Sequence, residues 1–452
     1  MAEQVDVVVV GLGVGGEEVA GRLAEAGLAV VGVEARLVGG ECPYWGCVPS
    51  KMMIRAANLL AEARRVPGMA GDSSVTPDWT PVALRIRAEA TDSWDDRVAV
   101  ERFERKGGRF VRGRARLVGP GRVAVGDREF AAGRAVVIAT GTHPVAPPVD
   151  GLAATPYWTN REAIENDTLP GSMLVLGGGA IGLELAQAYA RFGTAVTVVE
   201  ALDRLLAMEE PEASALAAET FASEGIGVHT SAKAAKVAHH DGTFTLTLDG
   251  GAELTGERLL VATGRRASVA DLGLDTVGLD PDARAVEVDE RMRAGERMWA
   301  VGDVTGHGAF THIAMYQAGI AVRDILGEPG PPADYRALPR VTFTDPEIGA
   351  VGLTEAQARE AGLKVAVGRA QVPSSARGWI HKAGNSGFHK LVADADRGVL
   401  VGATSAGPVG GEVLGALTVA VHGAVPVERL RHMIYAYPTF HRGIEDALRD
   451  LS

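Results

Sequence analysis

Two cysteines are the residues of this chain whose type and spacing point most directly to chemistry. Cys42 and Cys47 are the only cysteines among 452 residues, and four residues separate them. A disulfide across so short a loop would restrict the unfolded chain only slightly, so stabilisation is a weak reason for the pair. A zinc site needs about four ligands, and no second cysteine pair could complete one. The pair therefore favours a redox dithiol, with two buried thiols that do no chemistry as the alternative.

A glycine-rich pattern typical of dinucleotide binding precedes the cysteines. The apolar run at residues 7–10 predicts a strand buried on both faces of a parallel sheet. It leads into the pattern G-x-G-x-x-G, with Gly11, Gly13 and Gly16 in register. The first glycine allows a tight turn, the second lets a pyrophosphate approach the backbone, and the third lets the helix pack on the strand. The next predicted strand ends at Glu34, where an acid can accept hydrogen bonds from ribose hydroxyls.

The same unit occurs a second time along the chain. A predicted strand at residues 173–176 leads into Gly177, Gly179 and Gly182 in the same register, and the following strand ends at Glu200. Two complete units predict two bound dinucleotides, between which electrons can pass. A carboxylate at position 200 would repel a 2′-phosphate, and no arginine directly follows the strand. The sequence therefore predicts NADH rather than NADPH as the electron donor.

Several motifs together resemble the class I pyridine nucleotide–disulfide oxidoreductases, the group that contains dihydrolipoamide dehydrogenase, glutathione reductase and mercuric reductase. The resemblance covers essentially the whole chain. Its motifs are the cysteine segment 39–51, the A-T-G segments 139–141 and 262–264, the segment 299–303, and the opening of a dimerisation domain at 344–355. The cysteine segment departs from the family pattern at Glu41 and at the bulky Pro43, Tyr44 and Trp45.

The resemblance implies a role for each site residue. Cys47 would lie against the flavin of FAD and, as a thiolate, form a charge-transfer complex with it, whereas Cys42 would be the outer thiol that attacks a disulfide substrate. Both lie near an expected helix start, where the helix dipole lowers a thiol pKa. Lys51 would approach the flavin and pair with Glu184. The further cofactor-binding residues that the motifs imply are Thr140, Gly141, Gly264 and, for the flavin ribityl chain, Asp303.

The C-terminal segment departs from the family where the resemblance places a catalytic histidine. The family carries a His-Pro-Thr-x-x-Glu motif, whose histidine reaches across the dimer to act as a base toward the outer thiol. Here Tyr437 takes the place of the histidine, and Arg442 takes the place of the glutamate. A phenol titrates at about pH 10, so Tyr437 is a poor base at neutral pH. His441 is the candidate for a substitute base, and its geometry decides whether it can act.

This departure leaves three hypotheses for function. The first is an FAD enzyme that passes hydride from NADH to a Cys42–Cys47 disulfide and on to a disulfide or related thiol substrate. The second is a diaphorase-type enzyme whose flavin reduces a quinone, a dye or a metal ion without thiol cycling. The third is a flavin-bound, non-catalytic subunit of a complex. Mercuric reductases and large thioredoxin reductases typically use a further C-terminal redox pair, which this chain lacks.

Composition and charge narrow the choice of partners and compartment. The net charge is −12 with no basic stripe, which argues against nucleic acid as a partner. No apolar segment is long enough to span a bilayer, and the first strand begins too close to Met1 to leave room for a signal peptide. The histidines are scattered without ligand spacing, so we expect no metal site. We therefore expect a cytoplasmic homodimer that acts on a small-molecule electron acceptor.

The motifs predict an α/β fold with two Rossmann-type dinucleotide-binding domains, for FAD and NAD, and a C-terminal α+β dimerisation domain. The expected boundaries are 1–150 and 271–338 for the FAD-binding domain, 151–270 for the NAD(P)-binding domain and 339–452 for the dimerisation domain. Alternating polar and apolar residues at 243–248, followed by Asp249 and two glycines, predict a hairpin within the NAD(P)-binding domain.

Overall fold

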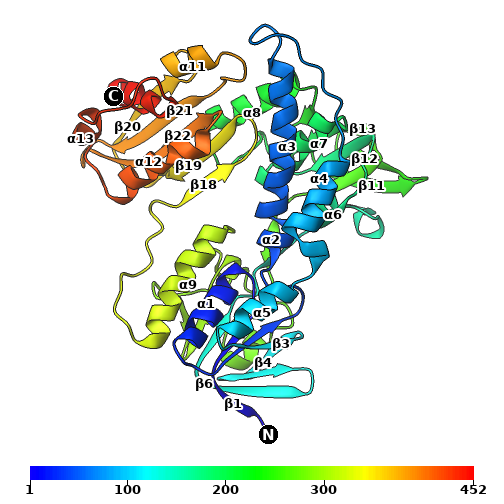
Figure 1. The fold of residues 1–452 in the computed structure, drawn as a ribbon, viewed down its shortest axis with the longest axis vertical. Helices are drawn as coiled ribbons and strands as arrows, with labels where there is room; N and C mark the ends of the chain where they lie inside the picture. The colour runs from blue at the N-terminus through cyan, green and yellow to red at the C-terminus, as the bar shows by residue number, and fades with distance from the viewer. The chain divides into compact units, whose positions relative to one another are not determined.

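Two structural units share the chain, and each is assembled from three separate stretches of sequence. The computed structural model describes all residues, Met1–Ser452 (Figure 1). Unit 1 contains Met1–Pro49, Ala83–Val145 and Gly264–Asp334. Unit 2 contains Ser50–Val82, Ala146–Thr263 and Tyr335–Ser452. No helix combines the length and the apolar character that a membrane-spanning segment needs.

A mainly parallel sheet forms the centre of unit 1. Its strands follow the order β16-β17-β6-β1-β2-β3, and β4 and β5 form an antiparallel extension beside β6. Their bounds are β1 (Glu3–Val10), β2 (Val30–Glu34), β3 (Arg109–Arg112), β4 (Ala115–Gly119), β5 (Arg122–Val125), β6 (Arg128–Ile138), β16 (Arg293–Gly295) and β17 (Met298–Ala300). Parallel neighbours β2 and β6 flank β1 on its two sides, and residues 7–10 are buried. The expected strand buried on both faces is therefore confirmed.

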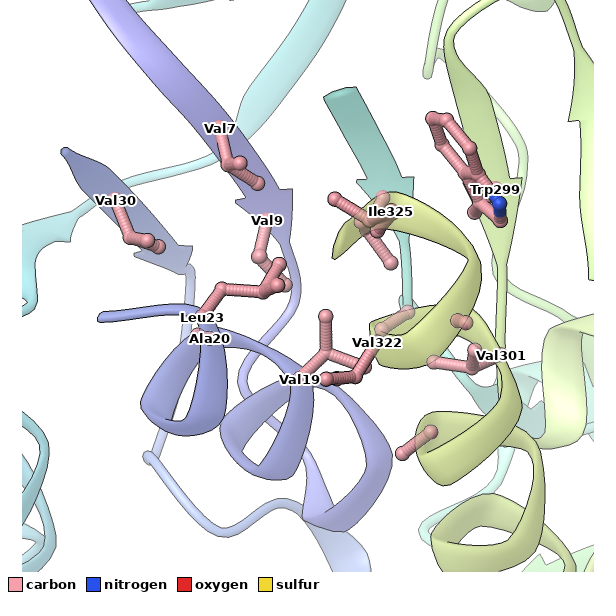
Figure 2. Close-up of a cluster of buried hydrophobic side chains, with 14 of the residues drawn as sticks. Val7, Val9, Val19, Ala20, Leu23, Val30, Trp299, Val301, Val322 and Ile325 are labelled. Carbon is pink, nitrogen blue, oxygen red and sulfur yellow. The ribbon is translucent and has the colours of Figure 1, made fainter. Parts of the chain in front are cut away.

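Two helices of unit 1 pack on the same face of this sheet. They are α1 (Val14–Glu25), which follows the first glycine pattern, and α9 (Thr311–Leu326), which follows β17. Figure 2 shows Val19 and Leu23 of α1 and Val322 of α9 gathered near Val9 of β1 in one apolar cluster. Fully burying each such side chain contributes about 1.5–3 kcal/mol. This packing fixes the first turns of both helices, which carry the residues considered below.

A second parallel sheet, in unit 2, repeats the first in smaller form. Its strand order is β10-β9-β8-β14, and an antiparallel sheet β11-β12-β13 belongs to the same unit. The bounds are β8 (Ser172–Leu176), β9 (Ala195–Val199), β10 (Gly227–His229), β11 (Ala234–His240), β12 (Thr243–Leu248), β13 (Glu253–Gly256) and β14 (Arg258–Val261), with helices α7 (Ala180–Phe192) and α8 (Pro211–Ser223). Antiparallel pairing of β12 with β13 confirms the hairpin expected at 243–248.

The C-terminal part of unit 2 is an antiparallel sheet with helices packed against it. The strand order is β18-β19-β22-β21-β20, and α12 and α14 supply much of the core that covers it. The bounds are β18 (Pro339–Thr342), β19 (Glu347–Gly352), β20 (Val365–Gln371), β21 (Phe388–Asp394), β22 (Val399–Gly407), α12 (Gly410–His422), α13 (Val427–Arg431) and α14 (Gly443–Asp450). The predicted combination of two dinucleotide-binding folds with an α+β C-terminal part is confirmed.

Candidate functional site

The first glycine pattern forms the turn between β1 and α1. Gly11 has φ +93°, and a Cβ there would lie 2.4 Å from the backbone oxygen of Ala139. A Cβ on Gly16 would lie 2.0 Å from the oxygen of Gly11, so the fold itself requires both glycines. Gly13 is different, because its φ of −65° suits any residue and a Cβ there would meet nothing nearer than 3.9 Å. The space beside Gly13, at the start of α1, fits a pyrophosphate that approaches the backbone.

The second glycine pattern repeats this geometry between β8 and α7. Gly177 has φ +115°, and its Cβ would lie 2.4 Å from the oxygen of Ala262, while a Cβ on Gly182 would lie 2.3 Å from the oxygen of Gly177. Gly179 has φ −83° and no atom within 4 Å of a Cβ. Each turn thus leaves its middle glycine open and fills the space beside the other two. The residues present therefore fit two dinucleotides.

The acids at the ends of β2 and β9 are fixed in the same way as each other. Each carboxylate accepts one N–H from the second residue of its glycine pattern and one from the residue two positions after the acid. The donors are Leu12 (2.8 Å) and Arg36 (2.7 Å) for Glu34, and Gly178 (2.6 Å) and Leu202 (2.7 Å) for Glu200. Both acids are therefore held where a ribose of a dinucleotide lies in such folds.

A chain of hydrogen bonds surrounds Asp303, which follows β17. The Thr142 hydroxyl donates to Asp303 Oδ2 at 2.9 Å, and Arg265 donates to the same hydroxyl at 2.8 Å. Burial raises the pKa of Asp303, and the Thr142 hydroxyl and the Arg265 charge oppose this shift. The nearby A-T-G turn contains Thr140, whose buried hydroxyl has no hydrogen-bond partner, and Gly141, whose φ is +66°. A buried polar group without a partner costs about 1–3 kcal/mol, so Thr140 fits a bound group that would pair with it.

Two separate helices carry the cysteines. Cys42 lies in α2 (Glu41–Trp45), and Cys47 is the first residue of α3 (Cys47–Arg65). The chain leaves helical geometry between them at Gly46, where φ is −128° and ψ is −119°. Both residues are thiols; Cys42 is half-buried and Cys47 is exposed. The Cys47 sulfur also lies 3.3 Å from the hydroxyl of Thr311, the first residue of α9, so Cys47 lies beside the starts of two long helices.

The two thiols differ in their ability to lose a proton. A hydrogen bond with Cys47 raises the pKa of the Cys42 thiol, and burial raises it further. The expectation of a lowered pKa is therefore wrong for Cys42, because α2 has only five residues and the hydrogen bond between the thiols outweighs its dipole. The raised pKa means that Cys42 keeps its proton at neutral pH.

The residues that depart from the family pattern around Cys42 have distinct surroundings. Tyr44 is buried, and this burial raises its pKa to about 12. Its ring centroid lies 5.8 Å from that of Trp45. Glu41 Oε2 lies 3.6 Å from Arg265 Nη2, which ties α2 to the strand β15 (Arg265–Ala267). Arg265 directly follows the second A-T-G segment, whereas no sequence signal pointed to Thr311.

Within unit 2 the structure brings Lys51 and Glu184 together. The Lys51 ammonium, on α3, lies 2.7 Å from Glu184 Oε2, on α7. The other carboxylate oxygen of Glu184 accepts the N–H of Phe343 at 2.9 Å, and the Lys51 ammonium lies 4.6 Å from the Phe343 ring centroid. Glu184 on α7 and Phe343 after β18 thus hold the Lys51 side chain in place on α3. Sequence reasoning missed Phe343, which directly follows β18.

The C-terminal candidates lie between α13 and α14. Tyr437 is 70% exposed, and the Arg442 guanidinium lies 5.5 Å from its ring centroid. Arg442 also pairs with Glu445 at 2.9 Å. The His441 ring lies 3.4 Å from the hydroxyl of Thr439. The Tyr437 side chain is therefore largely open to solvent in a single chain. The His441 ring instead contacts Thr439 of its own segment.

Comparison with known families matches nearly the whole chain. Residues 5–318 match the family described as pyridine nucleotide-disulphide oxidoreductase. Residues 338–448 match the dimerisation domain of the same family. The second match covers the C-terminal antiparallel sheet described above.

Two curated relatives are similar over nearly their full length. The chain is 35% identical to mercuric reductase of Streptomyces lividans over 453 residues, covering 97% of this chain and 94% of that protein. It is 34% identical to dihydrolipoyl dehydrogenase of Chlorobaculum tepidum over 462 residues, covering 100% of this chain and 97% of that protein.

Solved structures share the fold over the same extent. One is LpdA from Mycobacterium tuberculosis, with a TM-score of 0.85 and 26% identity over 99% of both chains. Another is the Cu(II) complex of the HOCl-induced flavoprotein disulfide reductase RclA from Escherichia coli, with a TM-score of 0.85 and 26% identity over 99% of both chains.

Proposed function

We propose a specific reaction for this chain, which belongs to the pyridine nucleotide-disulphide oxidoreductase family. As a member it is a flavoprotein disulfide oxidoreductase that depends on FAD and NAD(P)H. The proposed reaction transfers hydride from NADH through FAD to a Cys42–Cys47 disulfide, which then reduces a disulfide or related thiol substrate. The observation that carries the proposal is the thiol pair: a hydrogen bond links Cys42 with Cys47, which begins α3 and lies 3.3 Å from the Thr311 hydroxyl.

The reaction balances as NADH, a proton and a substrate disulfide giving NAD⁺ and two thiols. Bound FAD supplies the step that converts hydride into two electrons. The electrons break the Cys42–Cys47 bond, and one proton remains on Cys42, where burial and the bond to Cys47 hold it. Cys42 must lose this proton before its sulfur attacks the substrate disulfide and releases the first thiol. Cys47 then attacks Cys42, releases the second thiol and restores the disulfide.

NADH is the proposed donor because of the surroundings of Glu200. Its carboxylate would repel a 2′-phosphate. Arg204, the first arginine after the strand, donates to the backbone oxygens of Ala207 (2.7 Å) and Glu209 (2.9 Å) and to the hydroxyl of Ser214 (2.7 Å). Because these bonds to its own loop and to α8 occupy the guanidinium, Arg204 is poorly suited to bind a phosphate. Both features favour NADH over NADPH.

The second candidate is direct reduction of a quinone or a metal ion. It is favoured by Tyr437 and Arg442, which replace a base and its orienting acid, and by the raised pKa of the Cys42 thiol. Both features slow thiol exchange, whereas direct reduction of an acceptor needs no base at Cys42. A soft metal ion could also bind the two thiols as a substrate. One similar protein is a mercuric reductase, and one similar structure is a Cu(II) complex.

An anaerobic titration of the purified holoenzyme with NADH separates the two candidates. Uptake of two equivalents, passing through a long-wavelength absorbance band, is expected if the thiols cycle. The Cys42→Ser variant should keep this band because Cys47 remains, and the Cys47→Ser variant should lack it. Uptake of one equivalent with simple bleaching in the wild type would instead support the second candidate. A protein that oxidises no NADH with any acceptor would support the role of a non-catalytic subunit.

A further inference from the structure

A cluster of buried charges joins the NAD-binding part of unit 2 to its C-terminal sheet. The Lys390 side chain, on β21, is 2% exposed, and its ammonium lies 2.9 Å from Glu210, 2.9 Å from Glu212 and 3.0 Å from Glu355. Arg369, on β20, pairs with Glu212 and Glu355 at 3.2 Å and 3.1 Å. Glu210 is buried as well, and its other oxygen accepts the N–H of Glu355 at 2.7 Å. Two acids that begin α8 are thus held by the C-terminal sheet.

A second ion pair holds the neighbouring acid. Arg340, on β18, donates two hydrogen bonds to the carboxylate of Glu209, at 2.6 Å and 2.9 Å. This planar, two-point geometry is the stronger kind of charged hydrogen bond. The side chains are 22% and 11% exposed, so water screens the pair only in part. Glu209, Glu210 and Glu212 therefore all attach to cations of the C-terminal sheet, and we call this set the acid clamp.

The acid clamp lies at one end of the loop that begins at Glu200. Between Glu200 and the acid clamp, the loop rests on the second glycine turn, because Leu206 donates its N–H to the oxygen of Gly178 at 2.9 Å. The Leu205 side chain is buried, and a Cβ on Gly178 would meet it at 2.7 Å. Arg204 braces the middle of the loop through its bonds to Ala207, Glu209 and Ser214.

We infer that Arg340 and Lys390 are positioning residues for dinucleotide recognition. By holding the acid clamp, they fix the loop that begins at Glu200 and that contacts Gly178 through Leu205 and Leu206. The inference rests on the proposed function, in which Glu200 binds the adenine ribose of NADH. Neither cation need touch the dinucleotide, because the loop connects the acid clamp to Glu200 and so holds Glu200 in place.

The test is NAD⁺ binding to the oxidised holoenzyme by calorimetry. The Arg340→Gln and Glu209→Gln variants should each bind NAD⁺ about tenfold more weakly, since each removes one charged two-point contact. The double variant should bind no more weakly than either single variant, because both remove the same contact. At saturating NADH the limiting rate of flavin reduction should stay unchanged, which a general loss of structure would not allow.

The matched control is Lys364→Gln, which removes one positive charge from the residue directly before β20 of the same sheet. Lys364 is 73% exposed and pairs only loosely with Asp396 at 3.5 Å. The Lys364→Gln protein should therefore bind NAD⁺ as tightly as the wild type. Lys390→Arg should preserve affinity where Lys390→Gln loses it. If the Lys390→Gln protein does not fold, the Arg340→Gln and Glu209→Gln variants still test the inference. Their ion pair is more exposed than Lys390, so its loss should leave the protein folded. Folded Arg340→Gln and Glu209→Gln proteins with wild-type affinity would overturn the inference.

Glu200→Gln separates this inference from the proposed function. A Glu200→Gln protein that binds NAD⁺ as tightly as the wild type would overturn the assignment of Glu200 as the ribose-binding acid, and this inference with it. Weaker binding by Glu200→Gln together with unchanged binding by Arg340→Gln would leave the proposed function standing and reject the acid clamp alone.

Discussion

At the scale of single residues, the proposed reaction requires Cys42 to lose its proton before thiol exchange. The hydrogen bond to Cys47 and burial both raise the pKa of this thiol. The attacking species is the thiolate, so a group that removes the proton determines the rate. Tyr437 replaces the family histidine, so no imidazole stands at this position to remove the proton. The reductive half of the reaction, which needs no base, should therefore be much faster than thiol exchange.

Restoring the dyad should speed the loss of this proton. The double variant Tyr437→His, Arg442→Glu should raise the steady-state rate of disulfide reduction by about a hundredfold, the usual contribution of a positioned base. The rate of flavin reduction by NADH, followed by stopped-flow absorbance, should not change. Tyr437→Phe serves as the control, because it alters the same position without adding a base. Equal rates for the double variant and the wild type would show that proton removal from Cys42 does not limit exchange.

A buried histidine gives a prediction on stability. Burial lowers the pKa of His389 to about 4, while its bond with the backbone of Phe440 and the charge of Asp446 oppose the shift. In the unfolded chain the same ring takes up a proton below about pH 6.5. The unfolded state therefore binds more protons between pH 6.5 and 4, and the free energy of unfolding should fall by about 3 kcal/mol across this window as pH decreases.

Urea unfolding at pH 7.5 and pH 4.5 measures this effect. His389→Asn cannot titrate, so it should lose less stability than the wild type between the two values. Carboxylates titrate in both proteins. Subtracting the stability loss of His389→Asn from that of the wild type therefore removes the contribution of the carboxylates. Parallel losses of stability would contradict a lowered pKa for His389.

At the scale of elements, each glycine turn contains two kinds of glycine. The first and third glycines are required by the packing of the fold, whereas the middle glycine leaves space for a dinucleotide. Gly13→Ala and Gly179→Ala add a methyl group where no protein atom is close, at backbone angles that alanine adopts. Both variants should fold, with Gly13→Ala losing FAD and Gly179→Ala keeping FAD but binding NAD⁺ about tenfold or more weakly. Flavin absorbance and calorimetry measure these losses. Gly16→Ala is the contrasting variant, because its methyl group would lie 2.0 Å from the oxygen of Gly11 and should prevent correct folding.

The elements that could be predicted are those whose signal is local. Strand, glycine turn, helix, strand and terminal acid follow one another within about thirty residues, so their order alone indicates the fold. Contacts between distant segments had no such signal: Thr311 beside Cys47, Phe343 beside Lys51 and Arg340 beside Glu209 each depend on packing. The error on the Cys42 pKa has the same origin, because the bend at Gly46 and the bond between the thiols are properties of the folded segment.

At the scale of the whole molecule, the family's dimerisation domain spans residues 338–448 and contains Tyr437. Near this residue the chain exposes large apolar side chains, with Ile434 96% and Met433 45% exposed. Large apolar side chains left exposed at adjacent positions of a dimerisation domain favour an interface at this segment. We expect a homodimer in which Tyr437 of one subunit completes the thiol site of the other.

Dissociation should therefore remove thiol-dependent activity before it removes activity with dyes. Ile434→Lys buries a charge in the expected interface, which should shift the protein to monomers at micromolar concentration, as measured by light scattering. Disulfide reduction should fall with the dimer fraction, whereas NADH-dependent dye reduction should persist, because it needs only the two dinucleotide sites of one chain. Val98→Lys is the matched control, since it places the same charge at an exposed position on α5 (Arg97–Arg105) of unit 1. A monomeric Ile434→Lys protein that reduces disulfides at the wild-type rate would place the complete thiol site within one subunit, and Tyr437 would then have no role in it.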